Sequence, residues 1–153
     1  MQIPEVKVID LETPVKSIGK IYTGDYSKSP QYIMEIQAAM KEKNIPFIEN
    51  KVMGVYYDNP ADKKPGELKS FQGVFLKEDI KYSGSSLTEI IISGKCVYTK
   101  VSGDPVRSLY EGYNAVFGFI QKNKIELKSS EGYQVSTFEN GVITTEIYMR
   151  IKQ

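Results

Sequence analysis

Apolar residues recur at short intervals along residues 5–23 and predict a β-strand there. The Ser-Pro pair that follows predicts a helix, with Ser29 as the N-cap and Pro30 at the first helical position. From there the apolar residues recur every three or four positions, which is the period of a helix with one buried face: Ile33, Ile36 and Met40. Strand-like runs at 52–57 and 68–76 close this half of the chain.

The second half repeats this order of patterns. Residues 89–101 read as a strand, and Asp104 and Pro105 predict the start of a second helix. The predicted apolar face of that helix consists of Leu109, Tyr113, Phe117 and Ile120. Residues 133–138 and 143–151 then form a predicted hairpin, because Asn-Gly between two apolar runs is a strong turn signal.

A repeated segment underlies this symmetry. Residues 17–30 (SIGKIYTGDYSKSP) return as residues 92–105 (ISGKCVYTKVSGDP), and each copy runs from a Gly-Lys strand into a helix start. We therefore expect a duplicated strand–helix–strand–strand unit of the α+β class, in which an antiparallel sheet carries two helices on one face and a pseudo-two-fold ligand cleft. The expected boundaries are 1–153 for a single domain, 5–76 and 89–153 for the two copies, and 77–88 for a polar linker between them.

The composition argues against several classes of function. The 153 residues contain 20 basic and 19 acidic side chains, a net charge of +1, so direct binding to nucleic acid is not expected. Neither a membrane-spanning run nor a signal peptide is recognisable, which predicts a cytoplasmic protein without a membrane partner. The single Cys96 lies in an apolar strand pattern, so we interpret it as a small core residue rather than a nucleophile.

The absence of histidine narrows the chemistry further. Without histidine, and with one cysteine, the chain lacks the residues for Ser-His-Asp or Cys-His nucleophile systems and for the usual zinc sites. We therefore expect no metal and no cofactor. The aromatic residues are 11 Tyr and 6 Phe, with no Trp. Tyrosine combines an apolar ring with a polar hydroxyl, which suits both a semi-polar pocket wall and a half-buried strand.

Glu146 is the leading candidate for a site residue. It lies in the apolar closing strand between Ile143 and Ile147, where a buried, unpaired carboxylate would be costly. In a pocket it can attract a cation or act as a general acid or base. Alternatively, strand alternation points it at solvent, as it does Thr144. Superposing the two copies places Glu146 opposite Phe71, which predicts an acid on one side of the cleft and an aromatic ring on the other.

Tyrosines supply the other candidate wall residues. Tyr56 and Tyr57 are adjacent on a strand and face opposite ways, so one can line the cleft while the other packs under the helix. Tyr110 and Tyr113 lie on the second helix, where Tyr113 either belongs to the core face or presents its hydroxyl to the pocket. Further wall candidates are Tyr133, Phe138 and Tyr148.

Three segments follow the pattern of a known protein family. GVYYDNPADKKPGELKSFQGVFL (54–76) is similar to the family's first half, with a Gly-x-Tyr-Tyr strand, an Asp-x-Pro turn and a Leu-(Lys/Arg)-Ser strand. GDPVRSLYEGYNAVFGFI (103–120) and TTEIYMRI (144–151) resemble its second helix and its Thr-Glu closing strand. On these motifs the chain resembles the GyrI-like domains. That family includes the effector-binding domains of AraC- and MerR-type regulators, the BmrR-like drug sensors among them, and stand-alone proteins. Without a helix-turn-helix segment, this chain resembles the stand-alone form.

The resemblance implies an aromatic pocket with an acidic group, suited to bulky and often cationic ligands. The chain departs from the family pattern on the third strand of the second half, where Gln134 stands in place of a glutamate. It departs again after Leu-Lys-Ser, where many members carry an acid and this chain has Phe71. The Gly-Pro-Tyr before the second helix is replaced by Gly103-Asp104-Pro105.

Three functional hypotheses follow. The leading one is a protein that sequesters or senses bulky hydrophobic or cationic small molecules, such as xenobiotics, in an aromatic cleft with a strand carboxylate. The second is a hydrolase that opens strained electrophilic natural products of the cyclopropanoid type, with Glu146 and Tyr113 as its catalytic residues. The third is a protein-interaction module, for example a gyrase inhibitor that binds a topoisomerase, or a partner of a DNA-binding regulator.

Overall fold

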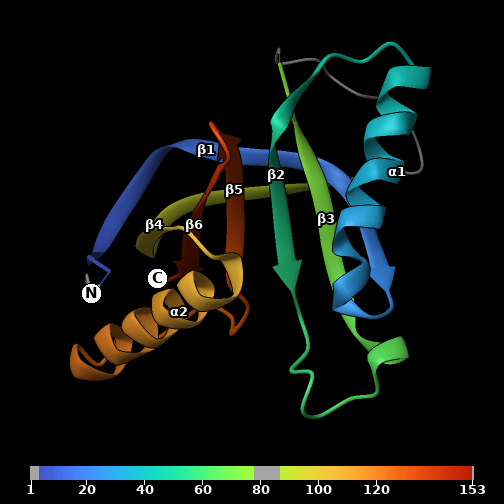
Figure 1. Ribbon diagram of the computed structural model, residues 1–153. Helices are drawn as coiled ribbons and strands as arrows, with labels where there is room; N and C mark the ends of the chain where they lie inside the picture. Colours follow the sequence, from blue (N-terminus) through green and yellow to red (C-terminus); the bar gives the residue numbers. More distant parts are fainter. Residues whose placement is uncertain (1–3, 78–86, 153) are drawn as a thin grey trace. The chain divides into compact units, whose positions relative to one another are not determined.

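The computed structural model describes residues 4–77 and 87–152, which form six β-strands and two α-helices (Figure 1). In chain order these are β1 (Val6–Thr23), α1 (Ser29–Glu42), β2 (Phe47–Tyr56), β3 (Lys69–Leu76), β4 (Thr88–Ser102), α2 (Pro105–Lys122), β5 (Tyr133–Glu139) and β6 (Val142–Arg150). The expected α+β class is confirmed, and the order strand–helix–strand–strand occurs twice. Most of the expected linker lies outside the described residues.

The chain divides into two compact units, and β1 contributes to both. One unit is Lys16–Ile91, and the other combines the start of the chain up to Val15 with everything from Ile92 onward. We call them the α1 unit and the α2 unit after the helix that each contains.

In the α1 unit, β3 lies between β1 and β2 and pairs with both in antiparallel register. Helix α1 packs on one face of these strands, where its Ile36 and Met40 meet Val74 of β3. Phe47 and Ile18 complete this fully apolar cluster. Burial of such side chains is the main favourable contribution to folding, at roughly 1.5–3 kcal/mol each.

A glycine pair sets the spacing between β1 and β3. Gly19 lies directly opposite Gly73, and a Cβ placed on Gly19 would collide with the carbonyl oxygen of Gln72 and with the backbone of Gly73. The register is continuous from Ile18 to Thr23, so Gly19 permits a close approach between two backbones. The absence of a side chain is therefore a structural requirement at this position.

In the α2 unit, β6 lies between β4 and β5, again with antiparallel pairing on both sides. Helix α2 covers one face, where Val116 packs against Val97, Ile147 and Met149. The first residues of the chain complete this unit. Val6 packs against the same cluster, and the carbonyl oxygen of the preceding residue, Glu5, accepts a hydrogen bond of 2.8 Å from the Thr99 hydroxyl.

Small residues allow α2 to lie close to its sheet. Ser108, Gly112 and Val116 form its buried stripe, and a Cβ on Gly112 would lie 3.0 Å from the Cδ1 atom of Ile147. The buried face of α2 is therefore displaced by one residue from the face that the sequence predicts. Leu109, Tyr113 and Ile120 pack beside the core, whereas Phe117, expected on the buried face, is 47% exposed.

The two helix starts differ from each other. Asp104 caps α2 as expected, since its carboxylate accepts a hydrogen bond of 3.1 Å from the Val106 backbone nitrogen. The expected N-cap at Ser29 is wrong, because Ser29 is already helical and Lys28 occupies the cap position without a side-chain bond. A short 3-10 turn precedes α1, and the Ser29 hydroxyl donates to the carbonyl oxygen of Tyr26 within it.

The expected hairpin is present between β5 and β6. Asn140 and Gly141 form its turn with φ angles of 51° and 76°, both in the left-handed region that these two residue types tolerate. The turn fixes the register of the two strands, in which Val135 lies opposite Glu146. No helix among the described residues is long and apolar enough to cross a membrane.

Candidate functional site

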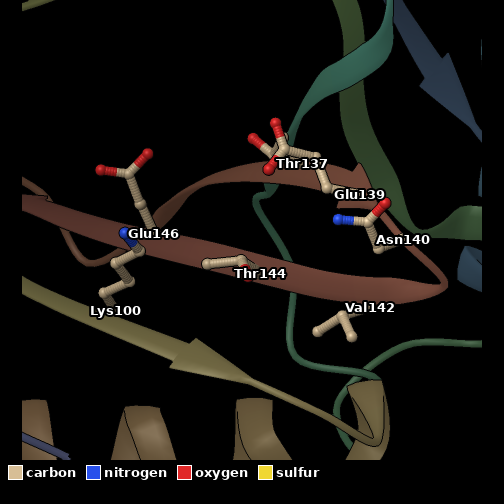
Figure 2. A pocket seen from close by; sticks show the side chains of 7 residues that line it. All are labelled: Lys100, Thr137, Glu139, Asn140, Val142, Thr144 and Glu146. Carbon is tan, nitrogen blue, oxygen red and sulfur yellow. The ribbon is translucent and has the colours of Figure 1, made fainter.

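The sheet of the α2 unit has one face covered by α2 and one face without a helix of its unit. Side chains alternate along a strand, so residues next to the core positions Val97, Ile147 and Met149 point the other way. Tyr98 on β4 and Glu146 and Tyr148 on β6 therefore share the second face, which we call the tyrosine face. Figure 2 shows the Glu146 carboxylate on the side of β6 away from the helix.

Three tyrosines cross this face in one row. Tyr148 lies opposite Tyr98 on β4 and opposite Tyr133 on β5. The rings of Tyr98 and Tyr148 are 5.1 Å apart and inclined by 59°, an arrangement that aromatic pairs favour. Tyr133 and Tyr148 are buried, and Tyr98 is half-buried. The tyrosine rings therefore make this face largely apolar, and their hydroxyl groups add polar atoms to it.

Glu146 connects two of these hydroxyls. Its Oε2 atom accepts a hydrogen bond of 2.6 Å from the Tyr98 hydroxyl and another of 3.1 Å from the Tyr148 hydroxyl. Bonds to an ionised acceptor are short and strong, so the two phenols fix the orientation of the carboxylate. Its other oxygen, Oε1, has no hydrogen-bond partner among the described residues.

The carboxylate also changes the acidity of the two phenols. Burial raises the pKa of the Tyr98 hydroxyl, and the hydrogen bond to Glu146 and its negative charge raise that pKa further. For Tyr148, burial again has the largest effect on the pKa, followed by the charge of Glu146 and the hydrogen bond to it. Both phenols therefore keep their protons at neutral pH and remain donors.

A pocket of about 440 Å³ extends from Glu146 towards the hairpin turn (Figure 2). Its lining residues are Lys100, Thr137, Glu139, Asn140, Val142, Thr144 and Glu146. Apart from Val142, these side chains are polar or charged. The aromatic row and this polar pocket meet at Glu146, which gives an amphipathic site with a carboxylate at the boundary.

A second polar group lies at the other side of the tyrosine row. Arg150 places its guanidinium 5.0 Å from the ring centroid of Tyr133 and bonds Glu131 at 3.4 Å and the Ser129 hydroxyl at 3.0 Å. The Tyr133 hydroxyl in turn donates to Glu131 at 3.5 Å. This cluster holds Tyr133 in place and covers part of its ring.

The sequence pattern of one family, the GyrI-like small molecule binding domain, matches residues 4–152. The chain belongs to this family. No curated protein sequence matches it.

Solved structures share the GyrI-like fold at low sequence identity. The EcmrR C-terminal domain superposes with a TM-score of 0.71 at 15% identity, covering 99% of both chains. A hydrolase from Listeria innocua gives a TM-score of 0.56 at 10% identity, covering 97% of this chain and 91% of its own. SAV2435 bound to tetraphenylphosphonium gives 0.54 at 12% identity, covering 99% and 97%. At these identities the similarity concerns the fold.

In this GyrI-like domain, Glu146, Tyr148 and Tyr133 of the expected site lie together on the tyrosine face. Tyr113 does not join them, because it packs on the α2 side of the sheet, where its hydroxyl accepts a hydrogen bond of 2.7 Å from Gln134. The catalytic pair of the hydrolase hypothesis, Glu146 and Tyr113, is thus split between the two faces of the sheet. Tyr110 is 70% exposed on the outer side of α2.

Phe138 on β5 is 44% exposed, and the other expected residues belong to the α1 unit. Phe71 is fully buried on the face of β3 opposite to Val74 and α1. Tyr56 points towards α1 and donates to the Ser29 hydroxyl at 3.3 Å, while Tyr57 points the other way and lies 5.6 Å from Lys69 Nζ. Of these two tyrosines, Tyr57 shares its face with Phe71. The pairing of Phe71 with Glu146 across a cleft stays a prediction.

Sequence reasoning missed Tyr98, which makes the shortest bond to Glu146. Tyr98 lies within the repeated Gly-Lys strand, and its alternation with Val97 signals that it leaves the core face. Its role depends on the register of β4 against β6, which no local pattern specifies. Sequence reasoning also missed Lys100 and Lys7, whose amine lies 5.8 Å from the Tyr98 ring centroid. The described residues contain no cluster suited to a metal ion.

Proposed function

We propose that this chain binds bulky aromatic small molecules that carry a positive charge, and that the tyrosine face of the α2 unit is the binding surface. The observation that carries the proposal is the Glu146 carboxylate, which two phenols orient and whose Oε1 atom is left without a partner among the described residues. Membership of a small-molecule-binding family supports it. So does the fold shared with SAV2435, a protein whose structure contains a lipophilic cation.

The physical basis is the combination of one fixed negative charge with aromatic rings. A delocalised cation gains Coulomb energy from a half-buried carboxylate, because solvent screens the interaction less there than at a fully exposed site. Its rings pack against the half-buried Tyr98, which supplies apolar area and attracts cations through its ring face, and the buried Tyr148 ring supports Tyr98 at 5.1 Å. A compact ammonium ion would gain the charge interaction without the packing, so bulky organic cations are preferred.

Isothermal titration with tetraphenylphosphonium tests the proposal. We expect wild-type protein to bind it, and Glu146→Gln to weaken binding at least about tenfold, since a charge-assisted contact is worth about 1.5–3 kcal/mol. The matched control is Glu49→Gln, which removes an exposed acid from the α1 unit and leaves the affinity unchanged. Equal affinities of wild type and Glu146→Gln would remove Glu146 as the anchor and reject the proposal.

A further inference from the structure

A positively charged side chain, Lys100, lies next to Glu146. Lys100 on β4 lies directly opposite Glu146 in the antiparallel register, and both residues line the same pocket. Side chains opposite each other in such a pair start about 4.5–5.5 Å apart at Cβ. Figure 2 shows the Lys100 side chain running from β4 towards Glu146 on β6. A positive charge is therefore built into the site beside the negative one.

The Lys100 amine is available to a ligand. Lys100 is exposed, and no ion pair or hydrogen bond joins its side chain to Glu146 or to another residue in the described part of the chain. Arg150, another cation on this face, is paired with Glu131. The Lys7 amine lies 5.8 Å from the centroid of the Tyr98 ring. Lys100 also lines a neighbouring pocket with Glu5 and Glu111, and no ion pair joins it to either of these acids in the described part of the chain.

Glu139 is the remaining acid of the pocket, and it lies at the far end. It pairs with Val142, which is four residues from Glu146 on β6. At about 3.3 Å per residue, the Cα atoms of Val142 and Glu146 are about 13 Å apart. At the level of the backbone, Glu139 is therefore the more distant of the pocket's two acids from Lys100.

We propose that Lys100 is a specificity-determining residue that selects aromatic ligands carrying both a positive charge and a carboxylate over ligands with a positive charge alone. The proposal rests on the proposed function and refines its ligand class. A zwitterionic ligand places its cationic part at Glu146 and its carboxylate at Lys100, so each charge meets its opposite. A simple cation gains the first contact and is repelled by Lys100.

A matched pair of dyes tests this selection. Rhodamine B carries a delocalised cation and a free carboxylate, and its ethyl ester carries the same cation without the acid. We expect wild-type protein to bind rhodamine B at least about fivefold more tightly than the ester by fluorescence anisotropy. Lys100→Met abolishes this preference and tightens binding of the ester and of tetraphenylphosphonium, whereas Lys100→Arg keeps the preference.

Lys95→Met is the control, because Lys95 is an exposed lysine of β4 outside the pocket. It leaves both affinities unchanged. Binding of both dyes that depends on Glu146, with a dye ratio that is the same in wild type and Lys100→Met, would overturn the role of Lys100 and leave the proposed function standing. Dye binding that does not weaken in Glu146→Gln, or no binding of either dye, would overturn both.

Discussion

The hydroxyl of Tyr98 donates to the Oε2 atom of Glu146 over 2.6 Å, from one strand to the next. A carboxylate in an apolar strand needs such a partner, because burial without one is costly. The bond joins two residues that are 48 positions apart in the chain, so the site exists only once β4 and β6 have paired. It holds the carboxylate at the edge of the aromatic row, where Glu146 lines the pocket.

Replacing Glu146 should change the ionisation of the two phenols. In Glu146→Gln the negative charge and the charged acceptor are lost, so the pKa values of Tyr98 and Tyr148 fall towards the ordinary value while the effect of burial remains. Absorbance at 295 nm during an alkaline titration measures tyrosinate directly. Two tyrosines should ionise at lower pH in the variant than in wild type, and superimposable curves would contradict the assignment.

Tyr98→Phe should weaken the fold modestly. The substitution removes one hydrogen bond to a charged acceptor and retains the ring, so we expect a loss of about 1–2 kcal/mol in the free energy of unfolding. Urea denaturation followed by circular dichroism measures it. Tyr110→Phe removes a hydroxyl from a side chain that is 70% exposed and should change the value by less than about 0.5 kcal/mol. Equal stabilities of the two variants would show that the Tyr98 bond contributes nothing.

Alkaline pH should destabilise the α1 unit through Tyr22. Burial, and then the charge of Glu35 and the hydrogen bond to it, raise the pKa of Tyr22 to about 12. The folded state therefore holds a proton that the unfolded chain releases near its ordinary pKa of about 10. The contribution of the protonated Tyr22 to the free energy of unfolding is complete below pH 10 and is lost as the pH rises through 12. Urea midpoints between pH 9 and 11.5 should fall more steeply for wild type than for Tyr22→Phe, and parallel slopes would refute this origin.

Gly19→Ala should be strongly destabilising. The added methyl group collides with the backbone of β3 at Gln72 and Gly73, so the two strands must separate, at a cost of about 3 kcal/mol or more. Thermal unfolding followed by circular dichroism measures the change. The matched control is Gly66→Ala, where a Cβ would meet nothing within 4 Å and the melting temperature should stay near that of wild type. A Gly19→Ala protein as stable as this control would rule out the close approach.

Local signals in the sequence predict much of this fold. The Asp104-Pro105 start of α2 and the Asn140-Gly141 turn follow from the capping and turn chemistry of single residues, and both are present. Local reasoning fails where packing decides. Phe117 has the correct spacing for the core, but the buried glycine at 112 draws α2 towards the sheet and turns Val116 inward.

The candidate site shows the same division. Strand alternation and composition predict Glu146, Tyr133 and Tyr148 as site residues, because each can be recognised by itself as a polar group in an apolar strand. Tyr98 and Lys100 escape this reasoning, since their importance comes from the residue opposite each of them on β6. The hypotheses of a hydrolase and of a protein-interaction module stay predictions, and the separation of Glu146 from Tyr113 argues against the residue pair suggested for the first.

The chain cannot be divided at the boundary that its repeat suggests. The α2 unit needs residues from the very start of the chain, since Val6 packs in its core and the Glu5 carbonyl oxygen accepts a bond from Thr99. A fragment that begins near Thr88 would contain an entire copy of the repeat and still lack Val6 and the hydrogen bond between Thr99 and Glu5. Synthesis on the ribosome places these first residues more than 80 positions ahead of the strands they join. The tyrosine face can therefore form only after β6 has been synthesised, because Glu146 and Tyr148 lie on that strand.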